Sequence, residues 1–253
     1  MKYLKELQTE RLFTLSDVAR LTGNKNTAAS LLAGYKRKGY VTGVRKDLYA
    51  ALDLASGNPI ASRYEIASRL TETSFVSHHT AMEFYGIANQ VFHTVTVSAK
   101  EKIRPFSFDG VPYQPVRTDL ADGVITPAYQ PAVRVTSLAR TVVDCIDEMG
   151  LTGGLEELLR CIALIPELDG EEVLRCLRAY GRKNLWQRTG FLLSLYKQEL
   201  RLPDRFFEEC RKNIGERKNY LNEGNDLVYY PEWRLYAPGD LEEITQEGEV
   251  ILV

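Results

Sequence analysis

The sequence predicts an α+β protein, in which an N-terminal winged helix-turn-helix is followed by a larger mixed α/β domain with a helical C-terminal part. Three observations predict this fold class. The first fifty residues are strongly basic, the same segment has the order of three helices and a hairpin, and the chain after Gly154 carries repeated helical stripes of apolar residues. We expect residues 1–52 to form the first domain, residues 53–61 a linker and residues 62–253 the second domain.

The charge of the chain is divided unevenly between these parts. Residues 1–50 hold ten Lys and Arg against four Asp and Glu, a balance of +6, whereas the rest of the chain holds 22 against 30, a balance of −8. The net charge of −2 hides this asymmetry. Because phosphate contacts need Lys and Arg on one surface, the asymmetry indicates a polyanion as a partner of the N-terminal domain.

Capping residues define the first two helices. Leu4 and Leu7 predict a first helix. Thr14 is a suitable N-cap for the second helix, with the acidic Asp17 three residues later, and Gly23 is placed to end that helix. The second helix is short, so it is stable only when it packs on its neighbours.

A third helix and a hairpin complete the N-terminal domain. The helix is predicted to start near Asn26 and to end at the basic run 36–38, with Gly39 as its cap. Residues 40–44 and 48–52 are predicted to be the strands of a hairpin whose tip carries two cations. Three helices followed by such a hairpin is the order of a winged helix-turn-helix.

The third helix has the composition of a helix that enters the major groove of DNA. Its solvent face carries small or polar residues, which allow a close approach to base edges, while the hairpin tip is placed to contact backbone or minor groove. The alternative is a small helical module whose charges are only solvated. The coincidence of basic tip, basic helix end and small-residue face favours duplex DNA as the partner. The predicted DNA-binding residues are Lys25, Asn26, Thr27, Ser30, Lys36, Arg37, Lys38, Arg45 and Lys46.

The rest of the chain alternates short helices and strands before it becomes mostly helical. Helices are predicted over 62–70, from the cap Ser77 to Gly86, and from the cap Ser137. Strands are predicted over 92–98, 103–108, 111–117, 123–125 and 133–135, and two short apolar runs follow near the end of the chain, at 227–230 and 233–236. A tail with five acidic residues and no cation is expected to be solvated; these are Asp240, Glu242, Glu243, Glu247 and Glu249.

Composition argues against several classes of protein. No apolar run approaches the length of a membrane span, and the first residues lack the apolar core of a signal peptide. The four cysteines form no C-x-x-C pair and lie in helical patterns, as buried thiols do; they are Cys145, Cys161, Cys176 and Cys210. We expect a cytoplasmic protein without disulfides, metal or cofactor.

The sequence contains no recognisable catalytic motif. There is no phosphate-binding G-x-x-x-x-G-K-[ST], no G-x-G-x-x-G and no H-E-x-x-H. The neighbours His78 and His79 point about 100° apart on a helix, so we expect packing or hydrogen bonding rather than a shared metal. Asp144 and Asp147 lie one turn apart, but Arg140 is spaced to pair with Asp144. We therefore expect no enzymatic activity.

The order of these segments resembles AbiEi-type regulators, the antitoxins of bacterial type IV toxin–antitoxin systems. The segments that carry the resemblance are 14–23, 39–49, 62–70, 75–81 and 133–144, and the resemblance extends to about Tyr236. Asp47 stands where the family's wing often has glycine, and Asp tolerates a left-handed turn. The resemblance implies an autorepressor that binds repeated half-sites in its own promoter. It also implies an antitoxin that opposes a nucleotidyltransferase-like toxin.

A second group of cations lies late in the chain. Arg182, Lys183, Arg188 and Lys197 surround a predicted helix, and they are either a solvated helix face or, as the resemblance suggests, the face that carries antitoxin activity. The alternative function for the whole chain is a winged-helix regulator whose second domain is a ligand sensor or an unrecognised enzyme.

Overall fold

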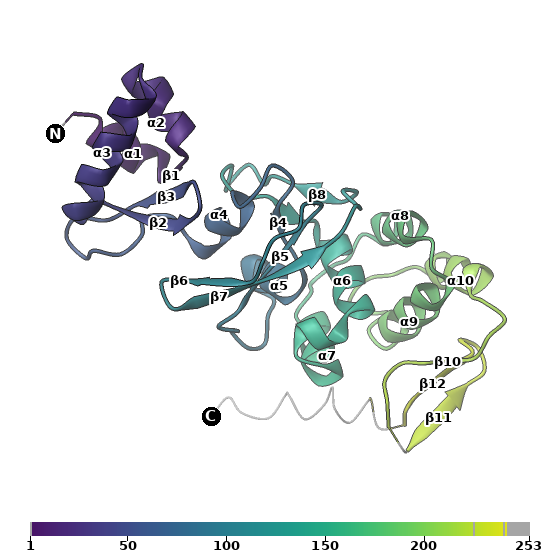
Figure 1. Cartoon of the computed structure of the whole chain (residues 1–253). Helices are drawn as coiled ribbons and strands as arrows, with labels where there is room; N and C mark the ends of the chain where they lie inside the picture. The colour runs from purple at the N-terminus through teal and green to yellow at the C-terminus, as the bar shows by residue number, and fades with distance from the viewer. Residues whose placement is uncertain (1, 225, 240, 242–253) are drawn as a thin grey trace.

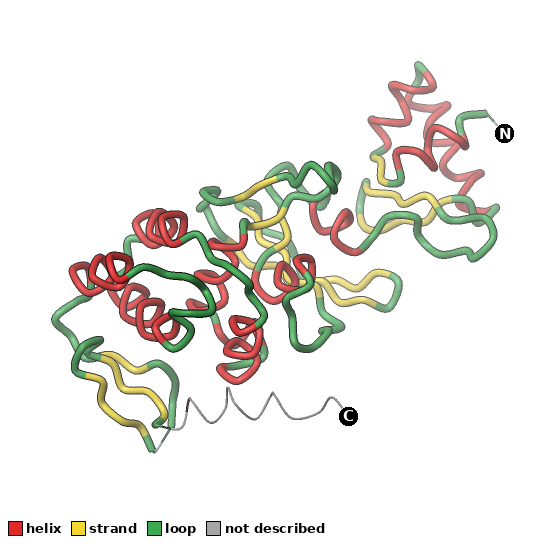
Figure 2. Tube along the Cα trace, turned by 180° about the vertical axis from the view of Figure 1, so that it is seen from behind, coloured by secondary structure: helices red, strands yellow, loops and turns green. Residues whose placement is uncertain are grey.

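The computed structural model describes residues 2–224, 226–239 and 241, and it has the predicted α+β organisation. The N-terminal helices and their small sheet lie at one end of the molecule, a mixed sheet lies in the middle, and helices with a second small sheet form the other end (Figure 1). Figure 2 shows the same succession from behind. The five acidic residues of the tail that we expected to be solvated, at 240, 242, 243, 247 and 249, lie outside the described residues.

The N-terminal module is a winged helix-turn-helix. Its elements are α1 (Leu4–Glu10), β1 (Leu12–Phe13), α2 (Leu15–Thr22), α3 (Lys25–Arg37), β2 (Val41–Arg45) and β3 (Leu48–Ala51). The strands form an antiparallel sheet in the order β1-β3-β2, so the predicted hairpin is widened by the two-residue β1. Phe13, Val18, Leu32 and Val41 fill the core between the helices and this sheet.

The caps predicted for the second helix are confirmed. The side chains of Thr14 and Asp17 form a reciprocal capping box, and Gly23 ends α2 with a φ of 75°. At the wing tip Asp47 has a φ of 60°, a left-handed conformation that glycine adopts without strain and that Asp tolerates. Its Oδ1 accepts a hydrogen bond from the backbone N–H of Leu15 at 3.1 Å, so the wing tip also caps α2.

Residues 53–61, which we expected to be a linker, form a compact turn. Asp53 Oδ1 accepts hydrogen bonds from the backbone N–H groups of Ala55 and Ser56, and the backbone N–H of Ile60 donates to Ala51. Beyond the turn, Leu12, Val44 and Leu48 of the wing sheet belong to the same buried cluster as Ile66 and Leu70 of the body. This shared cluster packs the N-terminal module against the body.

A six-stranded mixed sheet forms the middle of the molecule. Its strands and the two helices among them are α4 (Arg63–Ser68), β4 (Phe75–Val76), α5 (His78–Tyr85), β5 (Val95–Ala99), β6 (Phe106–Phe108), β7 (Val111–Arg117), β8 (Val124–Ile125) and β9 (Val135–Thr136). The order is β6-β7-β5-β4-β9-β8, with β5–β7 and β4–β9 parallel. We expected β5 to begin at Phe92. It begins three residues later, because the backbone N–H of Phe92 donates to Glu83 and the Phe92 ring stacks on His79.

The last part is a helical layer that ends in a small sheet. Its elements are α6 (Leu138–Asp147), a 3-10 helix (Met149–Thr152), α7 (Leu155–Ala163), α8 (Gly170–Tyr180), α9 (Lys183–Ser194), α10 (Asp204–Asn213), β10 (Asn219–Tyr220), β11 (Leu227–Tyr230) and β12 (Leu235–Pro238). The sheet order is β10-β12-β11. The apolar run at 233–236 divides between two roles: Trp233 turns inward against Gly190, where a Cβ would stand 2.2 Å from the indole, and β12 begins at Leu235.

The predicted state of the cysteines is confirmed. All four are free thiols, and each is buried in a helix of the body. Burial raises the pKa of Cys145, Cys161, Cys176 and Cys210 above the ordinary thiol value. None of the helices in the described ranges has the length and apolarity needed to cross a bilayer.

Candidate nucleic-acid interface

The helix α3 is oriented by the cap at its start. Asn24 has an extended backbone, and its Oδ1 accepts hydrogen bonds from the backbone N–H groups of Asn26 at 2.8 Å and Thr27 at 3.2 Å. These bonds satisfy two of the N–H groups that the first turn of a helix leaves free. Ala28 and Leu32 then anchor the helix on the core.

The opposite side of α3 is a continuous exposed face. Ala28, Leu32 and Tyr35 are buried and Leu31 is partly buried against the same core, while the exposed residues of the helix are small or polar and include no acid. We call this surface the α3 face, and its exposed residues are Lys25, Asn26, Thr27, Ala29, Ser30, Ala33, Lys36 and Arg37. Small side chains let a helix backbone come close to a partner, and the cations at both ends suit a polyanion.

The predicted cations of the module are available to a partner. Over residues 2–224, 226–239 and 241, no ion pair includes Lys25, Lys36, Arg37, Lys38 or Lys46, all of which are exposed. Lys36 extends over Gly43 of β2, so the end of α3 and the wing share one cationic surface. Each of these groups can exchange water for a phosphate without first losing a protein partner.

The two predicted wing cations are held differently. Lys46 is exposed at the tip. Arg45 is partly buried, and its guanidinium lies over the Phe106 ring of the body at 5.7 Å from the centroid. Its Nη1 is buried and makes no hydrogen bond to the described part of the chain. Arg45 therefore connects the wing to the body, whereas the Lys46 side chain is exposed to solvent.

The four late cations do not form one face. Arg182 lies at the start of α9 and pairs with Asp147 of α6. Lys197 lies beyond the other end of α9 and pairs with Asp204 at 2.5 Å. A helix of this length separates its ends by about 18 Å. Arg188 donates to the backbone oxygen of Tyr220 at 2.9 Å. Lys183 is exposed and makes no ion pair within the described residues.

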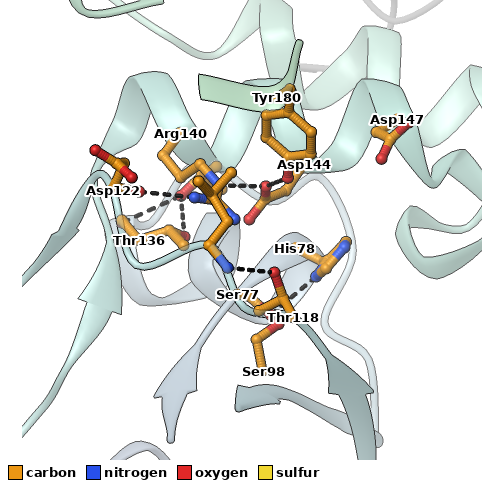
Figure 3. Close-up of polar contacts among 12 residues, drawn as sticks. Ser77, His78, Ser98, Thr118, Asp122, Thr136, Arg140, Asp144, Asp147 and Tyr180 are labelled. Carbon is orange, nitrogen blue, oxygen red and sulfur yellow. Dashed lines mark hydrogen bonds and ion pairs between the residues drawn. The ribbon is translucent and has the colours of Figure 1, made fainter. Parts of the chain in front are cut away.

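The carboxylates Asp144 and Asp147 face different partners. Arg140 Nε lies 2.5 Å from Asp144 Oδ1, and both side chains are almost wholly buried (Figure 3). Tyr180 donates a hydrogen bond to the same carboxylate, and Arg140 Nη1 donates to the backbone oxygen of Asp122 at 2.7 Å. The expected Arg140–Asp144 pair is confirmed, and it ties α6 to α8 and to the loop before β8.

Ser77 serves a different purpose from the one we expected. It stands at the N-cap position of α5 but makes no capping bond. Its Oγ lies 2.7 Å from Ser98 Oγ and 2.8 Å from His78 Nδ1, in the buried layer between α5 and β5 (Figure 3). His78 is buried and has a φ of 52°. The hydroxyl is drawn into this side-chain network instead of the helix terminus.

His79 occupies a buried position between two carboxylates. Its Nε2 lies 3.0 Å from Glu157 Oε1 and its Nδ1 lies 3.3 Å from Glu83 Oε1. Phe92 stacks on the ring at 3.7 Å between centroids, and Arg63 pairs with Glu83 at 2.6 Å. The expectation that the histidines serve packing and hydrogen bonding is confirmed for both His78 and His79.

His79, Glu157 and Cys161 bring three potential metal ligands within 4.8 Å of one another. The sequence did not indicate this group, because Glu157 lies 78 residues from His79. Glu157 already accepts hydrogen bonds from Asn89 and from the backbone N–H of Gln90. Burial raises the pKa of Cys161 to about 12, so the thiol stays protonated at neutral pH. Glu157 is therefore already engaged by groups of the protein, whereas His79 Nδ1 is buried and has no hydrogen-bond partner within the described residues.

The fold and the exposed surface together define a winged-helix α+β protein. No family model matches the chain, and neither does any curated protein. Among solved structures, the chain is similar to the crystal structure of the RV2827C protein from Mycobacterium tuberculosis, with a TM-score of 0.67 and 15% sequence identity. The match covers 97% of this chain and 93% of that chain. At this identity the similarity concerns the fold, and it extends over nearly the whole molecule.

Proposed function

We propose that the chain is a transcriptional regulator that binds duplex DNA through its winged helix-turn-helix. The observation that carries the proposal is the α3 face: exposed small residues without an acid, flanked by cations that have no ion-pair partner among the described residues. In this arrangement α3 enters the major groove and Lys46 reaches the backbone or minor groove beside it.

The test is a titration of the full-length protein with a labelled duplex that covers its own promoter. Affinity is expected to fall steeply between about 50 and 200 mM salt, with a log–log slope of about −0.9 for each phosphate neutralised. A shuffled duplex of the same length reports the non-specific part. Absence of binding at about 50 mM salt contradicts the proposal.

Sequence choice is proposed to come from the middle of the α3 face. Thr27 and Ser30 are exposed there, between the cationic ends. Replacing Thr27 by Ala is expected to change the ranking of promoter variants by about 1–3 kcal/mol at one base position. Thr9→Ala is the matched control, because Thr9 is an exposed threonine of α1 whose hydroxyl donates to its own helix.

The resemblance to AbiEi-type regulators supports a more specific proposal. The chain represses its own promoter and is the antitoxin of a type IV system, in which the body opposes a nucleotidyltransferase-like toxin. The order of the segments 14–23, 39–49, 62–70, 75–81 and 133–144 supports it. Arg182, Lys183 and Arg188 near the start of α9 are the residues that we assign to antitoxin activity, and Lys197 is separated from them.

Charge variants of the full chain separate the two activities better than a truncation does. Removing residues 1–52 exposes the apolar junction around Ile66 and Leu70, so the fragment is prone to misfold. We expect Arg37→Gln with Lys38→Gln to abolish repression and still rescue cells from the neighbouring toxin gene under an independent promoter. Arg182→Gln with Lys183→Gln is expected to do the reverse. If every variant rescues the cells equally, the assignment of antitoxin activity to α9 is wrong. If the wild-type protein does not rescue the cells, the antitoxin role itself is wrong.

A further inference from the structure

Three tyrosines form a row across the outer face of the C-terminal sheet. In β12, Leu235 and Ala237 are fully buried, so Tyr236 between them points to the opposite face. Tyr220 of β10 and Tyr229 of β11 are the register partners of Tyr236. The ring centroids of both neighbours lie 4.9 Å from that of Tyr236. We call these three side chains the tyrosine row.

The tyrosine row is not required by the core of the molecule. The inward tyrosine of the same sheet is Tyr230, which packs on Phe191 of α9 at 4.6 Å between ring centroids. Tyr220, by contrast, is 58% exposed, and Tyr229 and Tyr236 are only partly buried. A group of accessible aromatic rings on one face of a sheet indicates an interaction surface.

One cation lies directly beside the tyrosine row, and a cationic pocket opens between the start of β10 and α9. Lys218 Nζ lies 4.5 Å from the centroid of the Tyr229 ring. Beside β10 an open pocket of about 510 Å³ is lined by three cations and one acid, Arg182, Lys183, Arg217 and Glu216. Asp147 offsets the charge of Arg182 in part, so Lys183, Arg217 and Lys218 contribute most of the positive charge.

This surface lies at the end of the molecule opposite to the α3 face (Figure 1). A molecule bound at this surface is therefore either a second partner or a distant part of the molecule that contacts the α3 face. Stacked rings beside cations are the two elements that bind unpaired nucleotides, because the rings stack on the bases and the cations follow the phosphates. Bases inside a duplex cannot reach the rings.

We propose that the tyrosine row, with Arg217 and Lys218, binds an unpaired segment of RNA. RNA is the favoured partner because its recognition by sheets uses splayed bases of loops and ends stacked on aromatic side chains. A second copy of this chain is a poorer occupant, since a symmetric interface here sets Arg217 and Lys218 close to their own copies. The proposal does not depend on the function proposed for α3.

The test uses the full-length protein and a labelled, non-pairing RNA of 12 nucleotides. We expect Tyr220→Leu and Tyr236→Leu each to weaken binding about tenfold, because each removes one stacking ring while keeping an apolar side chain. Tyr220→Phe and Tyr236→Phe are expected to bind within about twofold of wild type, since stacking needs the ring and not the hydroxyl. Tyr129→Leu is the matched control, an exposed tyrosine elsewhere on the body.

Charge and specificity give the remaining readouts. Arg217→Gln with Lys218→Gln is expected to reduce the log–log salt slope by about 1.4, or 0.7 for each phosphate on a single strand. Affinity for promoter duplex and the thermal midpoint are expected to stay at the wild-type values in all these variants. The proposal is overturned if wild type fails to bind the RNA at about 50 mM salt, or if the Leu variants bind as wild type does. Tighter binding of single-stranded DNA of the same sequence also overturns the proposal. A change in the sedimentation of the Leu variants overturns it as well, because such a change means that the tyrosine row is a self-association surface.

Discussion

The N-terminal module and the body use their charged side chains in opposite ways. On the α3 face, Lys36 and Arg37 stand in solvent, and neither takes part in an ion pair within the described residues. In the body, Arg140 is 2% exposed and pairs with Asp144, and His79 is enclosed by Glu83 and Glu157. Within the described part of the chain, the cations of the α3 face are left unpaired, which supports the proposed external partner, whereas Arg140 and His79 of the body face carboxylates of their own chain.

This difference shows why a count of cations does not locate a binding surface. Arg182 and Lys197 stood out in the sequence beside the apolar residues of α9, yet each faces a carboxylate of its own chain. A paired cation must lose its partner before it can bind phosphate, while an unpaired one only exchanges water. The pattern of acids in space, rather than the local density of Lys and Arg, separates the two regions.

The largest effect that we expect is a loss of stability when the buried pair of α6 is broken. Arg140→Met leaves Asp144 buried without its cation and is expected to lower the free energy of unfolding by about 3–5 kcal/mol. Arg182→Met removes a half-exposed partner of Asp147 and is expected to cost less than about 1 kcal/mol. Urea unfolding measures both. Similar losses in the two variants contradict the contrast between buried and exposed pairs.

The second effect is a loss of DNA affinity without a loss of stability. Replacing Lys36, Arg37 and Lys38 together by Gln is expected to weaken binding to the promoter duplex about 100-fold at physiological salt and to reduce the salt slope by about 3. Its unfolding free energy is expected to stay within about 0.5 kcal/mol of wild type.

The control for that variant is the same change at three exposed cations of the body. These are Lys102, Arg205 and Lys212. Gln at all three leaves the net charge equal to that of the α3 variant, so any difference in affinity reports position and not total charge. Equal weakening by the two triple variants means that the α3 face is not the site.

The third effect separates the two wing cations. Lys46→Ala is expected to weaken duplex binding about 3–10-fold for all sequences alike, as the loss of one backbone contact does. Arg45→Ala is expected to keep binding within about twofold but to cost about 1 kcal/mol of stability, because its guanidinium packs on Phe106. Fluorescence anisotropy measures the duplex affinity of each single variant, and urea unfolding measures its stability. Loss of affinity in Arg45→Ala alone reverses the assignment.

Local signals in the sequence were enough to predict the module but not its attachment to the body. Thr14, Asp17 and Gly23 act on neighbouring backbone, so their capping roles follow from spacing alone. The attachment depends on contacts between distant segments. Arg45 meets Phe106 across 61 positions of the chain, and no local pattern marks Phe106 as its partner.

The same distinction holds in the body. The Arg140–Asp144 pair follows from i, i+4 spacing and was predicted, whereas Tyr180 reaches Asp144 from another helix and was not. Ser77 had the right position for a cap, but Ser98 and His78 compete for its hydroxyl. The tyrosine row depends on strand register, since Tyr220 and Tyr236 lie on different strands that pair in parallel. Sequence spacing predicts interactions within one element, and register and tertiary packing decide the rest.

The smallest effect concerns acid and the network around His79. Burial by itself raises the pKa of Glu157, but hydrogen bonds from Asn89, His79 and the backbone N–H of Gln90 outweigh it and leave the pKa below its ordinary value. The folded protein then binds this proton more weakly than the unfolded chain does. The stability that Glu157 contributes is therefore present above about pH 4.5 and is lost as the pH falls through the lower folded pKa.

Glu157→Gln is the variant that isolates this contribution. It is expected to flatten the decline of unfolding free energy below about pH 4.5, by at most about 1.4 kcal/mol for each pH unit, the limit for one proton. Glu156→Gln, an exposed neighbour on α7 whose partner Arg160 is one turn away, is expected to keep the wild-type profile. Urea unfolding at a series of pH values from 3 to about 6 measures the difference. If wild type and Glu157→Gln show parallel curves of unfolding free energy against pH, the acid sensitivity arises from groups other than Glu157. The contrast between the charges of the module and those of the body then rests on Arg140 and Asp144 alone.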